Sequence, residues 1–129
     1  MRHDLLNDAL AMIKNAEGSG KPAVTLRPAS KLVARVLRVL RENGYVGDFT
    51  FQEDGRGGAY EVLLSGNVND CGVIKPRFAV KRTDLQKYES RFLPAQDFGV
   101  LILTTTEGVL THSQAKEAGI GGRLLAYCY

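Results

Sequence analysis

Apolar and polar positions follow two different periods in the first half of the chain. Helical spacing predicts one helix between its N-cap Asp4 and Gly18, and a second helix that begins at its cap Ser30. Residues 23–26 alternate as in a strand, and so do the segments on either side of the Gly-rich turn at 55–58, which predicts a β-hairpin. The expected order of elements is therefore αβαββ.

The second half is mainly β in pattern. Residues 73–80 (VIKPRFAV) predict a strand, and the proline favours a position at a sheet edge. Residues 98–106 (FGVLILTTT) and 123–129 (RLLAYCY) are apolar at successive positions, as is typical of central strands covered on both faces.

Two short helices are expected between these strands. Thr83 with Gln86, and Thr111 with Gln114, have the spacing of a capping box, in which the two side chains bond each other's backbone amides. Gly119 suits the left-handed residue that follows a helix.

A turn-rich segment, GNVNDCG at 66–72, separates the two patterns. We therefore expect an α+β fold of two small domains. The division places an N-terminal αβαββ domain at 1–66 and a mainly β C-terminal domain with short helices at 67–129.

Composition limits the class of protein. A chain of 129 residues that is 44% hydrophobic can bury a core without disulfides. Cys71 and Cys128 lack the spacing of a metal site, so both are expected to be buried thiols. The apolar run at 100–103 is too short to cross a bilayer, and acids interrupt the N-terminal segment, so we expect a cytoplasmic protein without membrane partners.

The net charge of +3 conceals a strong segregation of charge. Residues 27–41 carry five basic residues and no acid, and residues 71–94 carry six basic residues against two acids. Residues 42–70 carry six acids against one arginine. Two basic blocks suit a polyanionic partner, although solvated faces would give the same pattern.

Hydroxyls and glycines gather near the end of the chain, in TTTEGVLTHSQAKEAGIGGR at 104–123. A turn at Thr106–Gly108 would place threonine hydroxyls at a strand end, free to bond phosphate, sugar or base edges. Gly121 and Gly122 would leave backbone uncovered for close approach of a ligand. The alternative is that the threonines only favour β structure and the glycines only serve a turn.

No catalytic or cofactor site is predicted. Thr105 as a nucleophile would need a base, and the histidines are only His3 and His112, the latter placed at a helix start. The chain contains neither GxGxxG nor GxxxxGK[ST] and no metal-ligand spacing. We therefore expect that the protein is not an enzyme and binds neither a cofactor nor a metal.

Four stretches in order resemble one family over essentially the whole length. They are DLLNDALAMIKNA at 4–16, PASK at 28–31 before a helix ending ENGY, the threonine turn at 104–108, and THSQAKEAGIGG at 111–122 before a terminal aromatic strand. The chain thus resembles the ribosomal protein S-eight family of the small subunit, in its archaeal and eukaryotic branch.

The resemblance implies a two-domain protein of the small ribosomal subunit in the cytoplasm. It would bind the central domain of small-subunit ribosomal RNA and support folding and assembly of that domain, beside neighbouring ribosomal proteins; its own messenger RNA is a further candidate partner. The residues implied for RNA contact are Thr104, Thr105, Thr106, Gly108, Gly121 and Gly122, with Lys14, Asn15, Ser30 and Lys31 in the N-terminal half.

Two departures limit what is carried over. Many bacterial relatives have a lysine where Glu107 stands, so a phosphate contact there is not transferred. Residues 82–99 replace a bacterial Lys-Pro-Gly element, and contacts of that element are not transferred either. On charge alone, the basic candidates near this region are Lys75, Arg77, Lys81 and Arg82.

Two other functions remain open. One is an RNA-binding regulator that acts off the ribosome through the same surface. The other is a small hydrolase or transferase that uses Thr105, for which the sequence supplies no partner base.

Overall fold

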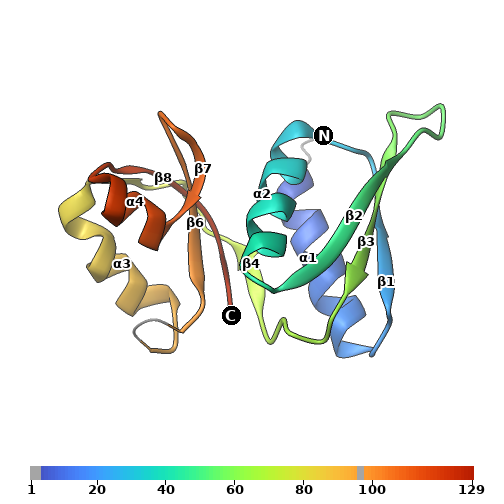
Figure 1. Cartoon of the computed structure of the whole chain (residues 1–129), viewed down its shortest axis with the longest axis horizontal. Coiled ribbons are helices and arrows are strands. Elements are labelled where there is room, and N and C mark those ends of the chain that lie inside the picture. The colour runs from blue at the N-terminus through green and yellow to red at the C-terminus, as the bar shows by residue number, and fades with distance from the viewer. Residues whose placement is uncertain (1–3, 96–97) are drawn as a thin grey trace. The chain divides into compact units, whose positions relative to one another are not determined.

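A computed structural model of the chain describes residues 4–95 and 98–129. Backbone contacts divide the chain into two compact units, the first ending at Cys71 and the second beginning at Gly72. Helices and sheets occur in both units, which confirms the α+β class (Figure 1). The domain boundary between residues 66 and 67 remains a proposal.

Two capped helices form one layer of the first unit. α1 (Leu5–Gly18) begins where an Asp4 carboxylate oxygen accepts the Asn7 N–H at 3.1 Å. α2 (Lys31–Glu42) begins where Ser30 Oγ accepts the Val33 N–H at 3.2 Å. Both caps are the ones predicted, because each satisfies an N–H that the first helical turn leaves free.

A three-stranded antiparallel sheet forms the other layer. β1 (Ala23–Leu26), β2 (Val46–Gln52) and β3 (Ala59–Leu64) lie in the order β1-β3-β2, with the predicted hairpin joining the last two. In Figure 1, α1 and α2 lie along the same face of this sheet and run in the same direction. Side chains between the two layers, including Ile13, Leu37, Leu40 and Val62, are fully buried.

Most of the side-chain hydrogen bonds in the hairpin loop between β2 and β3 are made by one carboxylate. Asp54 accepts the N–H groups of Arg56 at 2.8 Å and Gly58 at 2.9 Å, and its other oxygen pairs with Arg27 at 3.1 Å. The backbone donors first, and then Arg27, lower the pKa of Asp54, because each favours the ionised carboxylate.

The second unit is built on a five-stranded sheet. Its strands are β4 (Cys71–Val73), β5 (Ala79–Val80), β6 (Val100–Thr105), β7 (Gly108–Thr111) and β8 (Gly122–Cys128). The first residue of β4, Cys71, is the last residue of the first unit. The order is β4-β8-β6-β7, and β5 also pairs with β8. β6 and β8 therefore have neighbours on both sides, as predicted for the apolar segments.

The single strand expected at 73–80 is wrong, since β4 and β5 are separated by residues 74–78. Pro76 has no N–H to donate, and the chain leaves the ladder around it. The ends of the interruption still follow β8: the Ile74 N–H donates to the Leu125 carbonyl at 3.0 Å, and the Leu124 N–H donates to the Phe78 carbonyl at 2.9 Å.

Two helices cover one face of this sheet. α4 (His112–Ala118) has the predicted capping box: the Gln114 N–H donates to Thr111 Oγ1, and the Thr111 N–H donates to the side-chain oxygen of Gln114. Gly119 follows the helix in the left-handed conformation. The other predicted box is wrong. A 3₁₀ turn, η1 (Arg82–Asp84), leads into α3 (Leu85–Phe92), so Asp84 holds the N-cap position and makes no side-chain cap.

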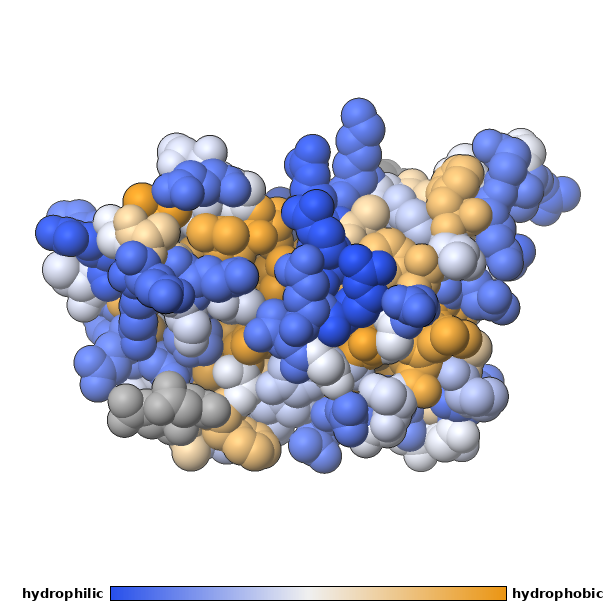
Figure 2. Space-filling model, viewed as in Figure 1, coloured by the Kyte–Doolittle hydropathy of each residue, from blue (hydrophilic) through white to orange (hydrophobic). Residues whose placement is uncertain are grey.

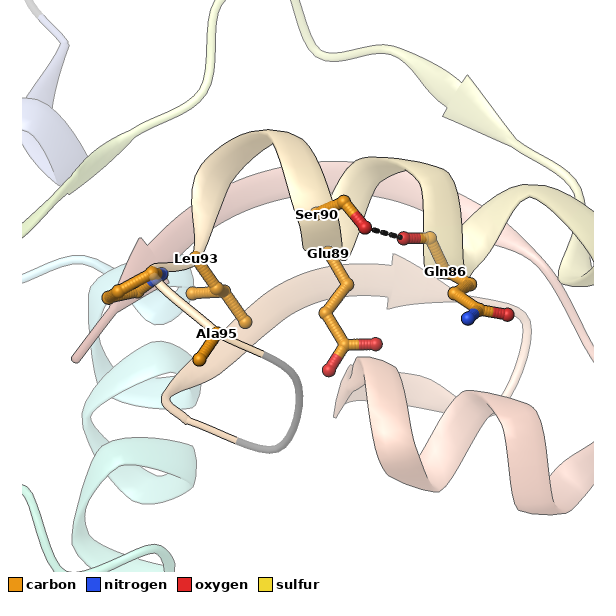
Figure 3. Close-up of a pocket in the computed structure, with 6 residues that line it drawn as sticks. Gln86, Glu89, Ser90, Leu93 and Ala95 are labelled. Atoms are coloured by element: carbon orange, nitrogen blue, oxygen red, sulfur yellow. Dashed lines mark hydrogen bonds between the residues drawn. The ribbon is translucent and has the colours of Figure 1, made fainter.

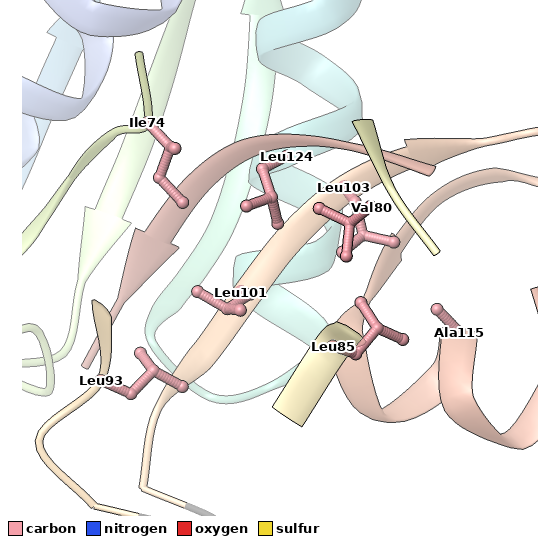
Figure 4. Close-up of a cluster of buried hydrophobic side chains, with 8 residues drawn as sticks. All are labelled: Ile74, Val80, Leu85, Leu93, Leu101, Leu103, Ala115 and Leu124. Carbon is pink, nitrogen blue, oxygen red and sulfur yellow. The ribbon is translucent and has the colours of Figure 1, made fainter. Parts of the chain in front are cut away.

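The core of the second unit lies between these helices and the sheet (Figure 4). Leu101 and Leu103 from β6 meet Leu124 from β8, while Leu85 and Ala115 come from the helices. Cys71 and Cys128 are both buried thiols that form no disulfide, as expected.

Candidate nucleic-acid interface

One end of the second sheet carries an open polar surface. Thr104 of β6 pairs with Arg123 of β8, and Arg123 pairs in turn with Ala79 of β5. Directly paired residues point to the same face, so these three side chains form a row across the sheet. The row borders a shallow depression of about 440 Å³. We call its lining residues the hydroxyl rim: Ala79, Thr104, Thr105, Thr106, Gly121, Gly122 and Arg123.

The threonines of the hydroxyl rim have different hydrogen-bond partners. Thr105 Oγ1 donates to the Gly108 carbonyl at 2.8 Å and accepts the Glu107 N–H at 3.0 Å. Its proton is therefore used to close the turn between β6 and β7. Thr104 and Thr106 are exposed, and their hydroxyls form no hydrogen bond with residues 4–95 or 98–129.

Packing and turn geometry within the chain itself require the glycines of the predicted site. A Cβ on Gly121 would collide with the Val80 carbonyl oxygen, and a Cβ on Gly122 would collide with the Thr104 carbonyl oxygen. Both glycines therefore let neighbouring backbone pass closely. Gly108 pairs with Thr105 at a φ of 108° with open space around it, so the turn conformation is what requires glycine there.

Arg123 was absent from the sequence-based site. It is exposed beside Thr104, and its guanidinium Nη1 donates to the Arg77 carbonyl at 3.2 Å. Arg77 and Lys75 lie in the interruption between β4 and β5, and both are exposed. The available signal was a basic residue directly after the two glycines in an otherwise apolar segment.

The N-terminal candidates do not form one site. Lys14 pairs with Asp70 at 2.8 Å, and Asn15 is exposed near the end of α1. The Ser30 hydroxyl is used as the cap of α2, which leaves Lys31 as the exposed charge at that helix start. Since α1 and α2 run in the same direction, the first pair and the second pair lie at opposite ends of the helical layer (Figure 1).

A second polar group of the same unit is buried. Glu89 and His112 are each 2% exposed, with 3.3 Å between a Glu89 carboxylate oxygen and His112 Nε2. Lys116 Nζ donates to the other oxygen at 3.1 Å. Figure 3 shows the Glu89 carboxylate pointing from α3 toward α4, beside a depression of about 190 Å³. We call these three residues the buried triad after Glu89 and His112; the Lys116 side chain is 40% exposed and pairs with Glu89 from the surface.

The tautomer of His112 follows from its other partner. Nδ1 accepts the Leu101 N–H at 3.1 Å, so the neutral ring carries its proton on Nε2 and donates it to Glu89. His112 is the first residue of α4, as predicted, and both of its ring nitrogens are engaged. His3, the other histidine, lies outside the described residues.

Within the described ranges, no three His, Cys, Asp or Glu side chains come together in a way that could hold a metal ion. In the same part of the chain, no helix is long and apolar enough to cross a membrane.

The fold and the hydroxyl rim define an α+β protein that presents exposed hydroxyls and an arginine at a sheet end. Comparison with known proteins assigns the family. Residues 4–129 match the family model described as ribosomal protein S8, and the chain belongs to this family.

Curated relatives agree with the assignment. The chain is 51% identical over 129 residues to a small ribosomal subunit protein uS8 of Picrophilus torridus, covering 100% of both chains. It is 53% identical over 126 residues to the protein of that name from Methanococcoides burtonii, covering 98% of this chain and 97% of the relative. A uS8 protein of Thermoplasma volcanium is 50% identical over all 129 residues.

Proposed function

We propose that this chain is a structural constituent of the small ribosomal subunit and binds ribosomal RNA directly. Family membership and the names of the relatives support this function. The observation in the structure that carries it is the hydroxyl rim. There, Thr104, Thr106 and Arg123 are exposed at one sheet end, while the polar side chains of the buried triad are paired.

The chemistry of the hydroxyl rim suits RNA. A guanidinium can pair with a phosphate, and hydroxyls can donate to or accept from phosphate oxygens, 2′-hydroxyls and base edges. Thr105 contributes by fixing the turn and by the lone pair that its hydroxyl retains. In this proposal the protein acts by binding, since the Thr105 proton and both nitrogens of His112 are committed to the fold.

The finer part of the proposal concerns the RNA region and the neighbours. We propose that the bound region is the central domain of the small-subunit RNA, that binding supports its folding, and that neighbouring ribosomal proteins complete the environment. Lys14, Asn15 and Lys31 would contact adjoining RNA from the first unit, and Lys75 and Arg77 would add charge near the hydroxyl rim.

Hydroxyl-radical footprinting of total small-subunit RNA with the full chain tests this function. We expect a compact protected region in the central domain, and the affinity should fall steeply with salt because bound basic residues displace counterions. Co-sedimentation with small subunits in high salt separates a resident protein from a free regulator. Protection outside the central domain would contradict the finer proposal, and an absence of protection would contradict RNA binding itself.

A further inference from the structure

The acid-free basic segment of the first unit forms a row on α2. Arg35, Arg38 and Arg41 are all exposed, and they repeat at the three-residue spacing that keeps side chains on one side of a helix. Neither Arg35 nor Arg38 forms an ion pair with any residue that the structure describes. Figure 2 shows strongly hydrophilic side chains over α2, with apolar side chains next to them toward β2.

Aromatic rings stand beside this row. The Arg41 guanidinium carbon lies 5.3 Å from the ring centroid of Phe49, a cation–π distance. Phe49 packs edge-on against Tyr60 with centroids 5.9 Å apart, and Phe51 does so at 6.0 Å. Phe51 is 56% exposed, although it lies on the same face of β2 as Phe49.

Arginines and a ring together line a depression of about 230 Å³. Its lining residues are Ala34, Arg35, Arg38 and Phe49. The lining is therefore mainly apolar and includes one ring. Arg35 and Arg38 contribute to it, and neither forms an ion pair with a described acid. Phe51 offers a second ring two residues further along the strand.

We propose that this arginine–phenylalanine face, made of Ala34, Arg35, Arg38, Phe49 and Phe51, binds an unpaired nucleotide of RNA. The base would stack in the depression against Phe49, the two arginines would pair with its phosphates, and Phe51 would take a neighbouring base. Stacking platforms beside basic side chains are the usual way in which proteins hold single-stranded nucleic acid. The inference rests on the proposed function and adds a further RNA contact on the first unit, apart from those proposed for Lys14, Asn15 and Lys31.

Charge alone would also suit an acidic peptide. The combination with rings favours RNA, because a base fills an apolar depression lined by a ring while its phosphates meet the arginines. A glutamate side chain would satisfy the arginines but would leave the ring surface uncovered.

Photochemical cross-linking of the full chain to total small-subunit RNA tests the contact directly. Trypsin cleaves after Arg41 and Arg56, so β2 is released in one peptide, residues 42–56, that contains both phenylalanines and no internal Lys or Arg. We expect a nucleotide adduct on this peptide, with fragment ions placing it at Phe49 or Phe51. Adducts confined to peptides of the second unit would overturn the inference and leave RNA binding itself intact.

Affinity measurements on matched variants give a second test. Arg38→Gln should weaken binding of the same RNA about fivefold, whereas Arg56→Gln removes an equal charge from the exposed hairpin loop and should change it little. Phe49→Leu should cost about tenfold in affinity through lost stacking. Because Phe49 is partly buried, the Phe49→Leu result counts only if this variant unfolds at the same temperature as the parent. If it does not, the comparison of Arg38→Gln with Arg56→Gln tests the inference.

The other possible outcomes of these measurements also test the inference. Equal effects of Arg38→Gln and Arg56→Gln would show that only net charge matters and would overturn the inference. If binding of a labelled polyglutamate required Arg38 and Phe49 while RNA binding required neither, the face would be assigned to an acidic protein. That result would overturn the inference as well. If the parent does not bind the RNA at all, the proposed function fails together with this inference.

Discussion

The hydroxyl rim and the buried triad are two polar groups of one unit that use their hydrogen bonds differently. In the buried triad, the Glu89 carboxylate accepts hydrogen bonds from His112 and Lys116, and His112 Nδ1 accepts a backbone N–H. The polar atoms of buried Glu89 and His112 are therefore satisfied within the protein. In the hydroxyl rim, Thr106 and Arg123 are exposed to solvent. The difference separates polar residues that stabilise the unit from polar residues that can bind a partner.

The largest expected effect comes from breaking the buried triad. Glu89→Ala leaves the Nε2–H of neutral His112 without its acceptor in a buried position. An unsatisfied buried donor costs about 1–3 kcal/mol, and the packing lost with the Glu89 side chain adds to that cost. Urea unfolding of the full chain measures this loss. Glu89→Gln keeps an acceptor for His112 and should lose less. A loss below about 1 kcal/mol for Glu89→Ala would show that this group contributes little to the fold.

A second effect tests the glycines. Gly121→Ala puts a methyl group against the Val80 carbonyl, and crowding of this kind costs about 1–3 kcal/mol. Gly18→Ala is the matched control, because nothing lies within 4 Å of its Cβ position, and it should be neutral or stabilising. If Gly121→Ala kept full stability but lost RNA affinity, the glycine would serve ligand approach and not strand packing.

The smallest expected effect on stability distinguishes Thr105 from Thr106. Thr105→Val removes both hydrogen bonds that close the turn and should lower stability by about 1 kcal/mol. Thr106→Val changes an exposed side chain, so its unfolding free energy should equal that of the parent within about 0.5 kcal/mol. Thermal unfolding of both variants provides the measurement. Equal losses would remove the distinction between a turn residue and a binding residue.

Local signals predicted most of the fold. The caps at Asp4, Ser30 and Thr111 act within four residues of sequence, and the β2–β3 hairpin follows from alternation around a turn, so both can be inferred from short stretches. The short strand β7 was not predicted. The capping box expected at Thr83 failed because a 3₁₀ turn moved the helix start by one residue.

The rest depended on partners that are distant in the sequence. Gly121 is required by Val80, which reaches it only after β5 pairs with β8. Glu89 entered the sequence analysis only as a charge in a basic block, and its burial depends on α4 docking beside α3. Thr104 to Thr106 could be placed at a strand end, but which hydroxyl closes the turn is set by the backbone geometry of that turn.

One comparison of affinities tests the central claim, that RNA is bound by the open polar groups of the hydroxyl rim. Thr106→Val combined with Arg123→Gln removes one hydroxyl and one charge from the rim, and Thr50→Val with Arg56→Gln removes the same groups from exposed positions of the first unit. In a filter-binding titration of small-subunit RNA at fixed salt, the first double variant should bind about tenfold or more weakly with unchanged thermal unfolding, because it loses a charge-assisted contact and a hydroxyl contact. The control should bind within about threefold of the parent, since it loses only nonspecific charge. Equal affinities for the two double variants would contradict the account.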